Sequence, residues 1–136
     1  MLLDLKGRKT IMVKEIHSDK APAAIGPYSQ AIQAGDFIYV SGQIGADPET
    51  GVPAEGIENQ TRQVLENIKV ILSEAGTDFS KAVKFTIYLT SMDSFATVNE
   101  IYGSYLTEPY PARATVEVSR LPKDVLVEMD VVVYNK

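Results

Sequence analysis

The sequence predicts an α+β domain in which one β-sheet is covered on one face by two amphipathic helices. Several segments alternate apolar and polar residues, as strands do, and two others repeat apolar residues at helical spacing. The elements follow in the order β-β-β-α-β-α-β-β, with three strands close together before the first helix. This order favours segregated helices on one sheet over alternating βαβ units. The length of 136 residues suits a single domain.

The first part of the chain is predicted to hold three short strands. Residues 12–17 alternate sufficiently for one strand, and a loop containing proline and glycine follows at 18–29. Residues 31–41 are typical of a hairpin that turns at Gly35-Asp36. Four glycines and two prolines make residues 42–56 a predicted loop.

The remaining elements alternate helix and strand before two final strands. Apolar residues at helical spacing predict a helix over 57–75 and a second helix over about 91–106. Strict alternation predicts a strand over 83–89, between the two helices. The last two strands are expected at 112–118 and 125–134.

The last predicted strand is apolar on both faces. One face is made up of Val125, Val127, Met129, Val131 and Val133. The opposite face mixes three apolar residues with Glu128 and Asp130. A strand that is apolar on both sides is usually buried on both. Two helices can cover only one face, so we expect another subunit to cover the other.

Composition excludes several classes of site. The absence of cysteine excludes disulfides, thiolate metal sites and a cysteine nucleophile. His17 is the single histidine, which excludes a multi-histidine zinc site but leaves carboxylate sites for harder cations open. The net charge of -5 argues against a nucleic-acid partner. No apolar run approaches the roughly 20 residues of a membrane span, and we expect a cytoplasmic protein.

Residues 1–11 are predicted to be a flexible extension, and residues 12–136 the single domain. The extension has neither the apolar segment nor the cleavage site of a signal peptide. It holds the one dense basic run of the chain, at residues 6–9. Met12 would then be the natural start, and the extension would have no role in the chemistry.

Common catalytic motifs do not account for this sequence. It contains neither a phosphate-binding Walker loop nor a G-x-S-x-G nucleophile motif. Ser41-Gly42 suggests a nucleophile, but the distant His17 leaves a base unassigned, so a serine hydrolase is disfavoured.

Five separated blocks, in order, resemble the Rid (YjgF-type) family. They are Gly-Pro-Tyr-Ser-Gln-Ala at 26–31, Val-Ser-Gly-Gln at 40–43, Asn-Glu-Ile-Tyr at 99–102, Pro-Ala-Arg at 111–113 and Glu-Val-Ser-Arg-Leu-Pro-Lys at 117–123. The resemblance runs from about residue 12 to 133. It implies a chorismate-mutase-like fold with a mixed sheet, a homotrimer, and active sites at the three subunit interfaces.

The resemblance also implies an activity that needs neither metal nor cofactor. This activity is the hydrolysis of reactive 2-imino or enamino acids, such as those derived from 2-aminoacrylate, to 2-oxo acids and ammonia. Pyridoxal-phosphate enzymes that dehydrate serine or threonine release such compounds. Two alternatives remain: a non-catalytic homologue that binds small carboxylates, and an RNA-acting translation inhibitor or ribonuclease, which the acidic charge disfavours.

Two ionisable residues suit the implied chemistry. The planar fork of an arginine binds a carboxylate through two parallel hydrogen bonds, and the resemblance assigns this role to Arg113. Glu128 is the candidate for holding the attacking water or moving a proton, because partial burial would raise its pKa. The alternatives are a surface arginine and a solvated strand carboxylate.

The resemblance places five further residues at the pocket. Tyr28 would lie near the substrate, Ser41 would hydrogen-bond substrate or water, and Gly42 would line the site. Asn99 lies off the apolar stripe of the second helix, and Thr115 stands where many members have cysteine. A packing tyrosine, a structural serine at a strand end and an exposed asparagine are the alternative interpretations.

Overall fold

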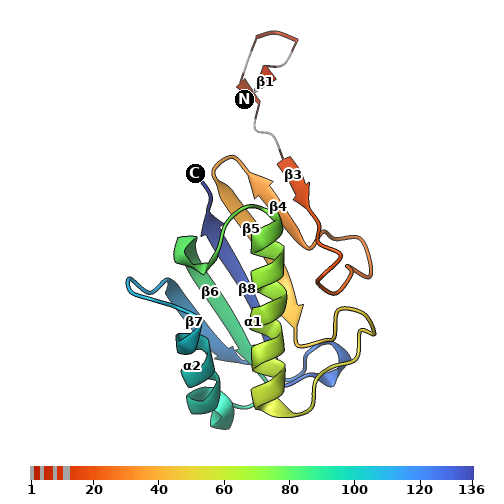
Figure 1. Cartoon of the computed structure of the whole chain (residues 1–136), viewed down its shortest axis with the longest axis vertical. Helices are drawn as coiled ribbons and strands as arrows, with labels where there is room; N and C mark the ends of the chain where they lie inside the picture. Colours follow the sequence, from red (N-terminus) through yellow and green to blue (C-terminus); the bar gives the residue numbers. More distant parts are fainter. Residues whose placement is uncertain (1, 4, 8, 11–12) are drawn as a thin grey trace.

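A mixed six-stranded sheet forms the centre of the computed structural model, which describes residues 2–3, 5–7, 9–10 and 13–136 (Figure 1). The strand order is β3-β4-β5-β8-β6-β7. The bounds are β3 (Val13–Ile16), β4 (Ala31–Ala34), β5 (Phe37–Ile44), β6 (Ala82–Leu89), β7 (Ala112–Glu117) and β8 (Val127–Tyr134). Only the β6–β7 pair is parallel among these strands. The predicted α+β class and mixed sheet are confirmed.

Two helices, α1 (Gly56–Glu74) and α2 (Phe95–Ser104), cover the same face of this sheet (Figure 1). Short 3-10 turns precede β6, α2 and β8 and are η1 (Phe79–Lys81), η2 (Met92–Ser94) and η3 (Pro122–Asp124). The second helix was expected over 91–106 and is shorter. The Ser91 side chain accepts a hydrogen bond from the Asp93 N–H and so closes a separate turn before the helix begins.

The core lies between the sheet and the helices. On β5, β6 and β8 alternate residues are buried against the helices, as the period of two requires. The largest of the fully buried side chains include Phe85, Ile38, Leu65, Ile68, Ile71 and Met129. Each such side chain contributes about 1.5–3 kcal/mol on burial.

Strand β5 is longer than expected, and the predicted loop over 42–56 was wrong at its start. The strand continues to Ile44, and its pairing with β8 shifts register between Val40 and Gln43. This irregularity is a bulge-like step at Ser41-Gly42, where glycine and its polar neighbours had indicated a loop. The step is where the candidate site begins.

The second face of the sheet carries no helix in the part of the chain that the structure describes. On β8 this face holds Glu128, Asp130 and Val132, all partly buried. Tyr39 of β5, in register with Val132, is 51% exposed. This face of the single chain is therefore partly apolar, as the sequence predicts.

Strands β1 (Leu2–Leu3) and β2 (Lys9–Thr10) form a separate two-stranded sheet among the described residues (Figure 1). The predicted domain boundary falls at residues 11 and 12, which lie outside the described residues, as do residues 1, 4 and 8. The flexibility of the extension stays a prediction. No helix in the described ranges is long and apolar enough to cross a membrane.

Candidate active site

The seven predicted site residues occupy two places in the molecule. Arg113, Asn99 and Thr115 lie together, where β7 meets α2. The second group lies where β5 meets β8 and the loop before β4, and consists of Tyr28, Ser41, Gly42 and Glu128. We call these the arginine site and the glutamate site.

Arg113 is exposed but held in a fixed orientation. It is in register with buried Phe85 on β6, so its side chain leaves the sheet on the helix side. Its Nη1 donates a hydrogen bond to Asn99 Oδ1 at 2.5 Å. The guanidinium also lies over two rings of α2, with its Cζ 5.5 Å from the Phe95 centroid and 5.2 Å from that of Tyr102. These contacts orient the fork and leave further N–H donors for a ligand.

Asn99 therefore has a role that the sequence did not indicate. The amide was expected to lie at the substrate pocket, and in the structure its Oδ1 accepts a hydrogen bond from Arg113. Its position on the exposed side of α2 lets its oxygen reach β7. The asparagine thus acts as a support for the arginine.

Thr115 follows Arg113 on the same face of β7. Its Oγ1 is buried, and no hydrogen-bond partner for it occurs among the described residues. The hydroxyl of Tyr102 is in the same state, and burial raises the pKa of Tyr102 despite the nearby Arg113. The hollow lined by Arg113, Asn99 and Thr115 has no space for a water molecule. The arginine site therefore has no cavity of its own.

Glu128 lies on the opposite face of the sheet, in register with Tyr88 of β6 and Ile44 of β5. Its carboxyl rests against the backbone of Gly42: a Cβ added there would be 2.5 Å from Oε2 and 2.9 Å from Cδ. Only glycine leaves room for the carboxyl in this position. Burial, and then the charge of Asp130, raise the pKa of Glu128. No hydrogen bond to this carboxyl occurs within the described ranges.

Ser41 and Tyr28 connect the glutamate site to the loop before β4. The Ser41 hydroxyl donates to the Ser29 carbonyl at 2.6 Å, and its N–H donates to the Gln30 carbonyl at 2.9 Å. The hydroxyl proton is thus engaged, and only its lone pairs are left for a ligand. Tyr28 is 51% exposed and lines the adjoining cavity.

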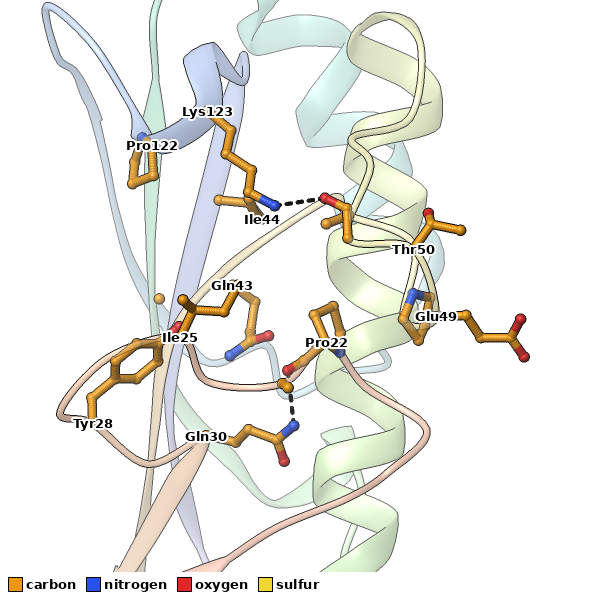
Figure 2. A pocket seen from close by; sticks show the side chains of 15 residues that line it. Pro22, Ile25, Tyr28, Gln30, Gln43, Ile44, Glu49, Thr50, Pro122 and Lys123 are labelled. Carbon is orange, nitrogen blue, oxygen red and sulfur yellow. Dashed lines mark hydrogen bonds between the residues drawn. The ribbon is translucent and has the colours of Figure 1, made fainter.

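This cavity has a volume of about 460 Å³, and Gly42 is one of the residues that line it. Figure 2 shows Tyr28, Gln30 and Lys123 among its lining side chains. Lys123 Nζ donates to the Gly51 carbonyl at 2.7 Å and so joins two of the loops that line it. Gln30 Nε2 donates to the Pro22 carbonyl at 2.9 Å. Sequence reasoning assigned no role to Lys123 or Gln30, although both stand inside the family-like blocks.

One chain does not bring the arginine and glutamate sites together. Arg113 points to the helix side of β7, while Glu128 points away from the helices on β8, and β6 separates the two strands. Within one chain, the predicted residues therefore form two separate groups and not a single site. Elsewhere, His17 Nε2 pairs with Asp19 Oδ1 at 2.8 Å. In the described part of the chain, no three His, Asp or Glu side chains gather as metal ligands do.

Comparison with models of known protein families identifies the class of this protein. The model of the family described as Endoribonuclease L-PSP matches residues 18–135. The chain belongs to this family, which includes the YjgF, RutC and RidA proteins.

Individual relatives cover almost the whole chain. A RutC family protein of Pyrococcus abyssi is 55% identical over 92% of this chain and 100% of its own. The 2-iminobutanoate/2-iminopropanoate deaminase of Salmonella typhimurium is 44% identical, again over 92% of this chain and 100% of its own. The crystal structure of RidA from an Antarctic Psychrobacter has a TM-score of 0.87 and 49% identity, covering 89% of this chain and 98% of that one.

Proposed function

We propose that this protein is a hydrolytic deaminase that converts reactive 2-imino or enamino acids to 2-oxo acids and ammonia. The observation that carries the proposal is the oriented, exposed guanidinium of Arg113. A bidentate arginine recognises a carboxylate by geometry as well as charge. The deaminase named in Salmonella typhimurium supports the same reaction class.

A neighbouring subunit completes the site in this proposal. The anchoring arginine and the half-buried glutamate lie on opposite faces of the sheet in one chain, so a second copy supplies the missing half. The partly apolar open face of β5 and β8 offers the surface for this assembly. In a homotrimer each subunit contacts the next one in the same way, which gives a closed ring with three equivalent sites.

The reaction then divides between the two halves. The substrate carboxylate binds Arg113, and the apolar side chain extends toward the cavity beside Tyr28 and Gly42. Water adds to the C=N carbon and gives a carbinolamine. Glu128 donates a proton to the nitrogen, ammonia leaves, and the carbinolamine hydroxyl returns its proton to Glu128 as the C=O bond forms. An imine carbon is electrophilic enough that no nucleophilic side chain is needed.

A coupled assay tests the activity. A pyridoxal-phosphate-dependent serine or threonine dehydratase generates the imine in the cuvette, and its disappearance is followed with and without this protein. We expect the protein to accelerate imine loss with stoichiometric ammonia and 2-oxo acid. Calorimetric binding of 2-oxobutanoate without any acceleration would instead favour the non-catalytic carboxylate-binding homologue.

Light scattering tests the assembly. We expect a mass of about three times the 14.9 kDa chain at micromolar concentration. A folded monomer with full deaminase activity would contradict the shared site.

RNA binding near physiological salt should be undetectable, because the chain's charge is -5. Tight, salt-sensitive RNA binding after removal of residues 1–11 would instead support an RNA-acting protein.

A further inference from the structure

A second carboxyl accompanies Glu128 on the open face of the sheet. Asp130 follows two residues later on β8, so both side chains leave the strand on the same side. Tyr88 of β6 is in register with Glu128, and its hydroxyl donates to Asp130 Oδ2 at 3.0 Å. Glu128, Asp130 and Tyr88 form a group that we call the carboxyl cluster.

The two carboxyls of the cluster are held differently. Asp130 has a fixed partner in Tyr88, whereas Glu128 rests against Gly42 without a hydrogen bond to any described residue. Each is partly buried. The cluster therefore combines an oriented carboxylate with a carboxyl that is free to exchange its proton.

Few other charged or titratable groups face the cluster from the neighbouring strands. The residues in register with Glu128 are Ile44 of β5 and Tyr88 of β6. Lys84 of β6 and Tyr39 of β5 are in register with Val132, and Tyr134 lies at the end of β8. On β8, Asp130 therefore lies between Glu128 and Val132, the residue that is in register with Lys84 of β6.

We propose that Asp130, fixed by Tyr88, is a positioning residue whose charge favours the protonated form of Glu128, the form that donates a proton to the leaving nitrogen. The proposal rests on the proposed deaminase function for the step that Glu128 performs. Two like charges on one strand face disfavour the second ionisation, and the fixed hydrogen bond keeps the Asp130 charge from turning into water.

The electrostatics of the cluster agree with this arrangement. Burial is the largest cause that raises the pKa of Glu128, and the charge of Asp130 is the second. Burial, the hydrogen bond to Asp130 and the Asp130 charge also raise the pKa of Tyr88. The tyrosine therefore remains a hydrogen-bond donor throughout the neutral range.

Asp130→Asn tests the proposal, because the amide oxygen still accepts from Tyr88 while the charge is removed. The Glu128 carboxyl is titrated by carbon-13 NMR, with its signal assigned by Glu128→Gln. We expect the Glu128 titration midpoint to fall in Asp130→Asn and the alkaline limb of the kcat/KM profile to move to lower pH. The rate should be almost unchanged below the titration midpoint of the variant and reduced about threefold or more above the midpoint of the wild type.

Two further variants sharpen the test. Asp36→Asn makes the same charge change at the β4–β5 turn and should move neither the midpoint nor the profile. Tyr88→Phe should lower the midpoint less than Asp130→Asn, because Asp130 keeps its charge and loses only its anchor. Circular dichroism checks that each variant is folded.

The outcomes separate this proposal from the proposed function. An unchanged Glu128 midpoint in Asp130→Asn overturns the positioning role, as does a lowered midpoint with an unmoved pH profile. A wild-type protein without deaminase activity overturns the proposed function and with it the catalytic use of the cluster. The NMR titration then still decides whether Asp130 controls the protonation of Glu128.

Discussion

The arginine site and the glutamate site place charged groups in opposite ways. At the arginine site, an exposed guanidinium is held by the hydrogen bond that it donates to Asn99 Oδ1 and by two aromatic rings. At the glutamate site, a half-buried carboxyl lies against Gly42 without a hydrogen-bond partner among the described residues. A permanent cation that is held rigidly suits binding and orientation. A carboxyl that is partly desolvated and unpartnered suits proton transfer, because neither of its charge states is locked.

Replacing Arg113 should have the largest effect. Its loss removes the only proposed anchor of a very small substrate, and breaking such a charged hydrogen bond costs about 1.5–3 kcal/mol or more. Arg113→Ala should lower kcat/KM by about 100-fold, measured in the coupled assay. Arg113→Lys keeps the charge but loses the fork, so we expect a strong loss there as well.

Arg120→Ala is the matched control for the arginine variants. Arg120 is exposed, and its Nε donates to Asp124 Oδ1 at 2.6 Å, so its guanidinium is already paired within its own loop. Its removal should change kcat/KM by less than about twofold. Near-normal turnover of Arg113→Lys would contradict the bidentate binding of the substrate carboxylate by Arg113.

Gly42→Ala should break the glutamate site alone. The new Cβ would lie 2.5 Å from Glu128 Oε2, so the carboxyl must turn away from its place. Because a positioned acid contributes about 100-fold or more, we expect kcat/KM to fall about 30-fold with KM little changed. Gly103→Ala is the control, since nothing lies within 4 Å of a Cβ there. Equal activity of the two alanine variants would contradict a role for the Glu128 position.

The sequence predicted the helices and strands but not the arrangement of the site residues. Alternation and helical spacing depend on neighbours along the chain, so β6, β8 and α1 were predicted within a residue or two at most boundaries. The exceptions are β5, which contains a bulge at Gly42, and α2, which is preceded by a separate turn capped by Ser91; a pattern of apolar residues encodes neither.

The separation of Arg113 from Glu128 was not predictable in the same way. Which strands pair, and which face each strand turns to the helices, depends on contacts between residues far apart in sequence. The order β5-β8-β6-β7 places the last strand in the middle of the sheet. The family-like blocks contain five of the predicted site residues, all but Thr115 and Glu128. The support of Arg113 by Asn99 and the bridge from Lys123 to Gly51 came only from the structure.

Asn99 variants should weaken the arginine site without abolishing it. Asn99→Ala removes one hydrogen bond to the guanidinium while Phe95 and Tyr102 remain, so kcat/KM should fall about fivefold, mainly through KM. Asn99→Asp keeps the oxygen acceptor but pairs the guanidinium with a charge that competes with the substrate. It should therefore raise KM further than alanine does. Asn59→Ala, which removes an exposed amide that donates to the Glu55 carbonyl just before α1, is the control.

Thr115→Val should have the smallest effect, and on stability rather than rate. The Thr115 Oγ1 is buried without a hydrogen-bond partner among the described residues, a state that costs about 1–3 kcal/mol. Valine has the same shape, so we expect the melting temperature to rise by about 3 °C while kcat/KM is unchanged. Thr61→Val is the matched control, because the Thr61 hydroxyl is buried and donates to the Ile57 carbonyl at 2.6 Å. That variant should lose about 1 kcal/mol. If Thr115→Val instead loses stability or activity, the hydroxyl has a partner in the assembled protein or in the substrate, and the arginine site extends to Thr115.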